Sequence, residues 1–167
     1  MYAINNNRNG KEYYSLIISK SVKRIFYQYR QTKNTNLEAC GILIGNHKLN
    51  SNLIYIKYAT IPQEKDTRSR YSFRLDSISH QNILEKHFKI SENEDVYLGT
   101  WHTHPENIPI PSKDDIIDWK KQYNTNKNLF KRMIFTIVGI KKVKYWMIDK
   151  NNLVELSGRE IIYEKDA

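Results

Sequence analysis

Short apolar runs alternate along the chain with longer stretches whose apolar residues recur every three or four positions. Runs of the first kind, bounded by turn residues, are typical of β-strands. They cover residues 13–19, 39–46, 53–60, 95–104, 132–140 and 142–149, with two shorter closing runs at 153–157 and 160–164. Lys141 and Lys142 mark the expected turn between two of these strands. The pattern therefore predicts a sheet of many short strands.

Three stretches carry the spacing of an amphipathic helix instead. The first follows Ser21, its expected N-cap; the second begins at Ser77, and the third begins near Ser112. Their apolar stripes consist of Val22, Ile25, Phe26 and Tyr29; of Ile78, Ile83, Leu84, His87 and Phe88; and of Ile116, Trp119 and Tyr123. Residues 61–70 are expected to form a charged loop. Helices placed before, between and after strand runs predict the α/β class, a mixed β-sheet flanked by helices.

Length and composition favour one soluble domain. The 167 residues, of which 40% are hydrophobic, suit a single domain spanning residues 1–167. No apolar run approaches the roughly 20 residues of a membrane span, and residues 1–14 lack the apolar stretch of a secretory signal. We expect a cytoplasmic protein with no membrane partner.

The basic charge is weak evidence about partners. The formal net charge is +9, which favours polyanions in principle. The lysines are spread along the chain, however, and no nucleic-acid-binding motif with interleaved aromatic residues and glycines occurs. Solvated surface charge is the preferred interpretation, and a nucleic-acid partner is not expected.

Cysteine content restricts the chemistry. The lone Cys40 can form no internal disulfide and no thiolate zinc cage, so a metal site must use nitrogen and oxygen ligands. Cys40 itself is expected to be strand core, since no histidine can be placed beside it to activate a thiolate.

Two histidines on one strand are the strongest candidates for such ligands. Alternate side chains of a strand share a face, so His102 and His104 point the same way, about 6 to 7 Å apart. A catalytic zinc takes three protein ligands and leaves one position to water. Asp115 is the candidate third ligand, although Asp114 competes with it. The intervening loop contains three stiffening prolines, Pro105, Pro109 and Pro111.

A purely structural interpretation competes with metal binding. Ser112 is a plausible helix N-cap, and a carboxylate three residues later is favoured by the helix dipole and often does nothing beyond capping. A strand histidine pair is also more often structural than metal-bound. Trp101, directly before His102 on the same strand, faces away from both histidines and is expected in the core, while His47 and His80 lack a partner at any ligand spacing.

The combination resembles the JAMM/MPN (JAB-domain) zinc metalloprotease signature. That signature is His-x-His, seven residues, then Ser-x-x-Asp, with a glutamate upstream near a strand. Here His102-Thr103-His104 is followed by residues 105–111 and then by Ser112-Lys113-Asp114-Asp115. Four residue types at fixed spacing are far more specific than a lone His-x-His.

The resemblance implies the roles of individual residues. Zinc (Zn²⁺) would be held by His102, His104 and Asp115, which selects Asp115 over Asp114. Glu38, in a segment similar to the family's Glu-x-x-Gly, would be the general base; Glu12 and Glu64 stay open as alternatives. Ser112 would hydrogen-bond the oxyanion. The implied fold is the JAMM/MPN cytidine-deaminase-like sandwich, and the implied reaction is hydrolysis of a peptide or isopeptide amide.

A closer resemblance, over about half the chain, implies a substrate. Residues 59–76 and 99–115 are similar to the standalone JAB isopeptidases of bacterial CBASS anti-phage operons. This resemblance implies a deubiquitinase-like activity, which cleaves the amide bond between the C-terminus of a cyclic-oligonucleotide synthase and its target protein. Two alternatives are a JAMM peptidase that processes a small sulfur-carrier or ubiquitin-like protein, and a non-catalytic binding scaffold. Arg68, Arg70 and Arg74 either contact an extended acidic tail or are solvated loop residues.

Overall fold

The computed structural model describes residues 14–48, 51–158 and 161–164. Residues 1–13 lie outside the described residues. Glu12, one of the alternative bases, and nearly all of the N-terminal segment in which no secretory signal is expected therefore have no structural description. Within the described residues, no helix is long and apolar enough to cross a membrane.

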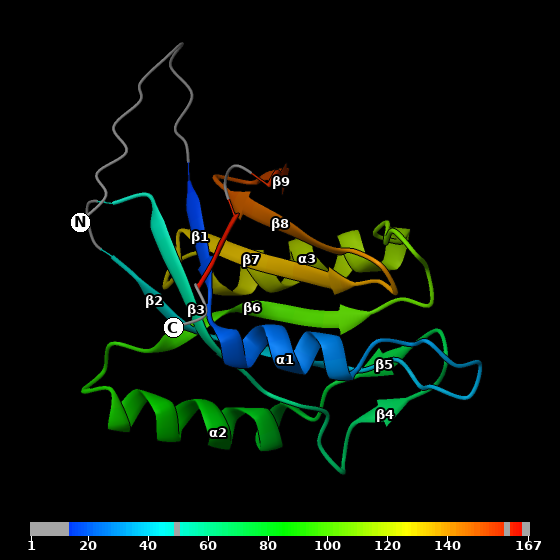
Figure 1. Cartoon of the computed structure of the whole chain (residues 1–167). Coiled ribbons are helices and arrows are strands. Elements are labelled where there is room, and N and C mark those ends of the chain that lie inside the picture. Colours follow the sequence, from blue (N-terminus) through cyan, green and yellow to red (C-terminus); the bar gives the residue numbers. More distant parts are fainter. Residues whose placement is uncertain (1–13, 49–50, 159–160, 165–167) are drawn as a thin grey trace.

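Eight strands form one mixed sheet in the order β10-β1-β3-β2-β6-β7-β8-β9 (Figure 1). Their bounds are β1 Ser15–Ile18, β2 Cys40–His47, β3 Leu53–Ala59, β6 Val96–Thr103, β7 Arg132–Val138, β8 Val143–Asp149, β9 Asn152–Leu156 and β10 Ile161–Tyr163. The pairs β1–β10, β1–β3 and β6–β7 are parallel, and the others are antiparallel. Every strand predicted from the apolar runs is confirmed. The predicted α/β class, a mixed sheet flanked by helices, is confirmed as well.

Three helices cover this sheet. They are α1 (Lys20–Gln28), α2 (Ser77–Ile90) and α3 (Lys113–Asn126). In Figure 1, α1 crosses in front of the sheet, α3 lies behind it, and α2 runs below β2 and β6. The buried apolar residues form two clusters accordingly, one that includes Phe26 of α1 and one that includes Trp119 of α3. The central strands β2 and β6 are therefore shielded from water on both faces.

A two-stranded hairpin departs from the predicted loop. Residues 61–70 include β4 (Thr67–Arg68), which pairs with β5 (Phe73–Arg74) in a separate small sheet. We call residues 67–74 the hairpin arm. Two-residue strands rich in charge carry no alternation, so the apolar pattern could not reveal them.

Two details of the helices also differ from expectation. Ser19, and not Ser21, caps α1, because its hydroxyl accepts the N–H of Val22. The apolar stripe expected on α2 is mostly not buried: Ile78 is 68% exposed, and His80 is the residue of this helix that is buried. His80 is buried together with its polar partners, which are described below.

Trp101 lies in the core, as predicted. Its indole is fully buried, packs against Phe26 with 5.3 Å between ring centroids, and donates an N–H to the carbonyl of Thr60 at 2.9 Å. Gly41 lies where this bond passes, so a Cβ there would collide with both the Thr60 carbonyl and the indole. Only glycine allows Trp101 to reach across β2 in this way.

Gly41→Ala should therefore lower the free energy of unfolding by about 1–3 kcal/mol, because the added methyl group displaces a buried indole hydrogen bond. Gly158→Ala is the matched control, since a Cβ at Gly158 meets no atom within 4 Å. Denaturant titration of both variants measures the difference. Equal unfolding midpoints for the two variants would contradict this account of the Trp101 contact.

Candidate metal centre

Strand β6 delivers two imidazoles to one place. His102 lies within β6 and His104 directly follows it, and the His102 Nε2 and His104 Nε2 atoms lie 3.1 Å apart. The side chain of His102 is 1% exposed and that of His104 is 14% exposed. The N–H of His104 donates to the carbonyl of Val138 at the end of β7, which fixes the backbone beyond the strand. The pair thus sits at the buried end of β6 and is reached by solvent from the His104 side.

Asp115 faces both imidazoles from the first turn of α3. Its Oδ1 lies 3.2 Å from His102 Nε2, and its Oδ2 lies 3.4 Å from His104 Nε2. Asp114, the competing carboxylate, is exposed.

Capping and metal ligation are compatible functions of Asp115. The hydroxyl of Ser112 accepts the N–H of Asp115 at 3.1 Å, and Asp115 Oδ2 accepts the N–H of Ser112 at 2.6 Å, which is a capping box. The capping interpretation is confirmed, and the same carboxylate lies against both imidazoles. The capping box fixes the carboxylate so that its oxygens point at the histidines.

The loop between His104 and Ser112 is held against the sheet. The N–H groups of Ile140 and Lys141, in the β7–β8 turn, donate to the carbonyls of Glu106 and Asn107. Pro109 is buried in the same loop. These contacts, together with the predicted stiffening by prolines, bring the start of α3 back to the end of β6.

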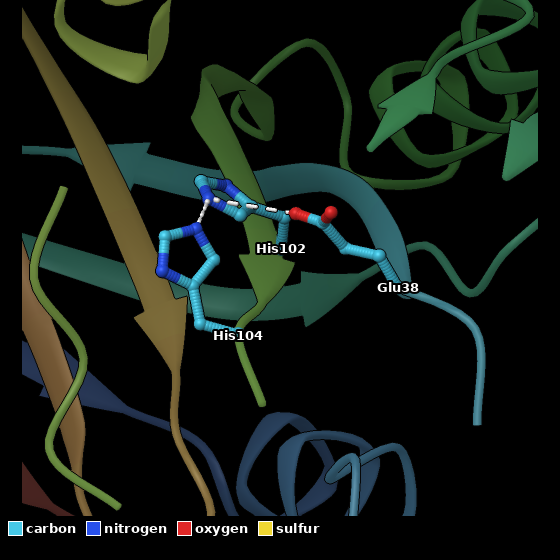
Figure 2. A group of neighbouring side chains, drawn as sticks. All are labelled: Glu38, His102 and His104. Atoms are coloured by element: carbon cyan, nitrogen blue, oxygen red, sulfur yellow. Dashed lines mark hydrogen bonds and ion pairs between the residues drawn. The ribbon is translucent and has the colours of Figure 1, made fainter. Parts of the chain in front are cut away.

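Glu38 reaches the same place from the segment that precedes β2. Figure 2 shows its carboxylate pointing towards the imidazoles, and Oε1 lies 3.9 Å from His102 Nε2. Cys40 pairs with His102 in the antiparallel β2–β6 ladder, which places Glu38 beside the end of β6. The N–H of Glu38 donates to the carbonyl of Ser69 in the hairpin arm at 2.7 Å. Glu64, an open alternative, is exposed.

The donor atoms fit a small divalent cation. Ligand atoms of Glu38, His102 and His104 all lie within 4.8 Å of one another, and the carboxylate of Asp115 lies closer still to both imidazoles. Two ligand atoms at about 2.0–2.1 Å from a tetrahedral zinc lie about 3.3 Å apart. The separations of 3.1, 3.2 and 3.4 Å among His102, His104 and Asp115 agree with that value.

Burial and charge displace the titration of these groups in opposite directions. Burial lowers the pKa of His102. Burial acts to raise the pKa of Asp115, but the two histidines outweigh it and hold that pKa well below its usual range. Burial raises the pKa of Glu38 to about 8, despite the opposing charge of His104. Glu38 therefore holds a proton more readily than an ordinary carboxylate.

A groove of about 750 Å³ opens beside these residues. The hairpin arm lines it with Arg70 and Arg74, and Ser112, Asp114 and Asp115 line it from α3. The guanidinium of Arg68 donates to the backbone carbonyl of Glu38 at 3.4 Å, and that of Arg70 donates to the backbone carbonyl of Lys33 at 2.9 Å. The site is therefore the floor of a groove between α3 and the hairpin arm.

Sequence reasoning missed a second buried polar cluster next to the site. His80 Nδ1 lies 2.6 Å from Thr60 Oγ1, and His80 Nε2 lies 3.1 Å from both carboxylate oxygens of Asp66. The thiol of Cys40 lies 3.8 Å from Asp66, and burial raises its pKa well above the ordinary value, so a thiolate is disfavoured as expected. The partners of His80 are 14 and 20 residues away, and no motif spacing signals them.

Comparisons with known proteins identify relatives that match most of this chain. Residues 19–152 match the Prok-JAB family, described as prokaryotic homologs of the JAB domain. A protein of Escherichia coli (strain TW11681) named "CD-NTase/cGAS isopeptidase" is 34% identical over 146 residues, which is 87% of this chain and 89% of that protein. A protein of the same name from Vibrio cholerae serotype O1 is 30% identical over 132 residues, or 79% of each chain. The solution structure of a Desulfitobacterium hafniense protein, 21% identical, covers 90% of this chain and 94% of its own with a TM-score of 0.61, which supports the fold.

Glu38→Gln should stabilise the protein after its metal is stripped. The pKa of Glu38 is raised from 4.5 to about 8. Between these pH values Glu38 ionises in the unfolded chain but stays protonated in the native protein, so the free energy of unfolding falls as pH rises through this range. The gain in unfolding free energy should be small at pH 4.5 and reach on the order of 2 kcal/mol above pH 8. Denaturant titrations across pH measure it.

Glu64→Gln serves as the control, because it makes the same chemical change at an exposed position. A Glu38→Gln gain that is the same at pH 4.5 and pH 9 would show that ionisation of Glu38 is not the cause.

Proposed function

This chain belongs to the prokaryotic JAB-domain family, and from that premise we propose that it is a zinc-dependent isopeptidase of the JAMM type. It cleaves the amide that joins the C-terminus of a cyclic-oligonucleotide synthase to a target protein. The observation that carries the proposal is the convergence of two imidazoles and one carboxylate at 3.1–3.4 Å on the floor of a groove, with a second carboxylate beside them.

His102, His104 and Asp115 are proposed as the zinc ligands. Their donor atoms have the mutual separations that one tetrahedral ion requires, whereas the Glu38 oxygen is farther from His102, at 3.9 Å. A bound zinc ion would supply Lewis acidity and lower the pKa of a coordinated water towards neutrality.

Glu38 is then the general base. Its buried carboxylate adjoins the ligands without completing their set, so it can take a proton from the attacking water and pass it to the leaving amine. Ser112 already accepts the N–H of Asp115 with its hydroxyl oxygen, so its own hydrogen can be donated to the developing oxyanion. Asp115 keeps Ser112 in place through the capping box. The capping box therefore fixes the proposed zinc ligand, Asp115, relative to the proposed oxyanion donor, Ser112.

The choice of substrate rests on relatives and on the groove. The E. coli and V. cholerae relatives are named as isopeptidases of a CD-NTase/cGAS protein, and this chain aligns with most of the length of both. The groove lies open between the hairpin arm and α3, which suits an extended tail whose acidic groups meet Arg74, while Arg70 adds positive charge to the same wall. The protein partner is accordingly a conjugated synthase tail.

A model conjugate, made of the synthase C-terminal tail linked by an amide to a reporter protein, tests the proposal. The wild type should release the tail, and chelator should abolish release. Glu38→Gln should keep stoichiometric zinc and lose about 10²–10⁴-fold in kcat, because it removes only the proton carrier. His104→Ala should lose both zinc and activity, since one of three ligands is gone.

Asp115→Asn and Asp114→Asn form a matched pair for the ligand assignment. An asparagine oxygen can still complete the capping box, so the helix should persist in both, but only Asp115→Asn should lose zinc. The wild type could instead be fully loaded with zinc and cleave a small sulfur-carrier fusion but not the synthase-tail conjugate. That result would contradict the proposed substrate and leave the proposed enzyme class intact. Wild-type rates in Glu38→Gln would overturn the assignment of the base.

A further inference from the structure

A buried hydrogen-bonded chain runs behind the proposed catalytic base. Thr103, the residue between the two histidines, is fully buried, and its side chain lies on the opposite face of β6 by strand alternation. Its hydroxyl oxygen accepts the N–H of Ala39 at 2.9 Å, and its hydrogen is donated to Oε1 of Gln31 at 2.8 Å. Gln31 is itself 1% exposed.

The same chain extends to the hairpin arm. The side-chain amide of Gln31 donates to the carbonyl of Arg70 at 2.9 Å and to that of Asn36 at 3.3 Å. One buried glutamine therefore joins three segments: the strand that carries the imidazoles, the segment that carries Glu38 and the arm that lines the groove. Nothing in the proposed chemistry uses either polar side chain directly.

The bond to Ala39 holds the peptide that links Glu38 to Ala39, beside the bonds that Ser69 and Arg68 make to the backbone of Glu38. Ala39 is the next residue after Glu38. The side chain of Thr103 accepts the N–H of Ala39, and the backbone N–H of Thr103 donates to the carbonyl of Ala39 at 2.9 Å, so both backbone polar groups of Ala39 are bonded to Thr103. Reaction rates depend steeply on such placement, because a displacement of about 1 Å at a reacting group can cost 10²-fold.

We infer that Thr103 and Gln31 are positioning residues, which set the carboxylate of Glu38 against the histidine pair and couple it to the groove-lining arm. This inference rests on the proposed hydrolase function. Thr103 acts through the Ala39 peptide and Gln31 acts through Thr103, and neither touches the substrate.

The chain offers a matched control for the loss of a buried hydroxyl. Thr136, on the neighbouring strand β7, is also fully buried, and its hydroxyl has no hydrogen-bond partner among the described residues. Thr136→Val therefore makes the same chemical change as Thr103→Val without breaking a bond. Thr103→Ser keeps the hydroxyl and removes only a methyl group.

The experiment measures zinc content, kcat and KM on the synthase-tail conjugate, and exchange of the Ala39 amide hydrogen with solvent in zinc-free protein. For Thr103→Val we expect full zinc occupancy, an unchanged KM, a kcat lower by about 10²-fold and faster exchange at Ala39. Thr103→Ser should restore kcat and protection, and Thr136→Val should match the wild type.

Gln31→Met, which keeps an unbranched buried side chain, should lower kcat in the same direction. The double variant with Thr103→Val should be no slower than the slower single variant, because both changes break one chain of bonds.

Three results would overturn the inference: a Thr103→Val enzyme with wild-type kcat, a Thr103→Ser enzyme as slow as Thr103→Val, or a Thr136→Val enzyme that is equally impaired. If instead the wild type does not cleave the conjugate, the proposed function fails. The exchange rates of Ala39 in the Val and Ser variants then still decide whether Thr103 holds the Glu38 segment.

Discussion

Two imidazole nitrogens that face each other at 3.1 Å, with both oxygens of one carboxylate turned towards them, are the feature on which the remaining chemistry depends. Polar atoms brought this close inside a protein lose water and need a compensating partner. A divalent cation satisfies all three groups at once. The end of β6 and the start of α3 are built to hold these side chains in place, the first by sheet pairing and the second by a capping box.

Strand β6 separates stability from chemistry by its alternation. Trp101 and Thr103 point to one side, where they fill the core and hold the neighbouring segment by hydrogen bonds. His102 points to the other side, near Trp119 of α3, with 6.4 Å between the ring centroids. A buried, hydrogen-bonded back face makes the metal-facing side rigid, which is the requirement for a preorganised site.

Much of the fold and site could be predicted from the sequence because local rules govern them. The strands follow from apolar runs, and strand alternation places His102 and His104 on one face. The choice of Asp115 over Asp114 came from the resemblance to the JAMM signature, and the structure places Asp115 beside both imidazoles. Gln31, His80 and the hairpin arm could not be predicted, because their partners are distant in sequence and polar contacts leave no periodic pattern. The orientation of Thr103 could have been predicted, since alternation places its side chain opposite the histidines, but its hydrogen-bond partners could not. The apolar periodicity predicted the helix α2 but not its buried residue, His80, because the partners of His80 are polar side chains on other segments.

The most direct test of the metal centre is a crystal structure with anomalous diffraction data collected on both sides of the zinc absorption edge. We expect one zinc ion at about 2.0–2.2 Å from a nitrogen of each imidazole and an oxygen of Asp115, with Glu38 outside the ligand set. A zinc ion coordinated by Glu38 in place of Asp115, or no anomalous peak between His102 and His104 in active protein, would contradict it.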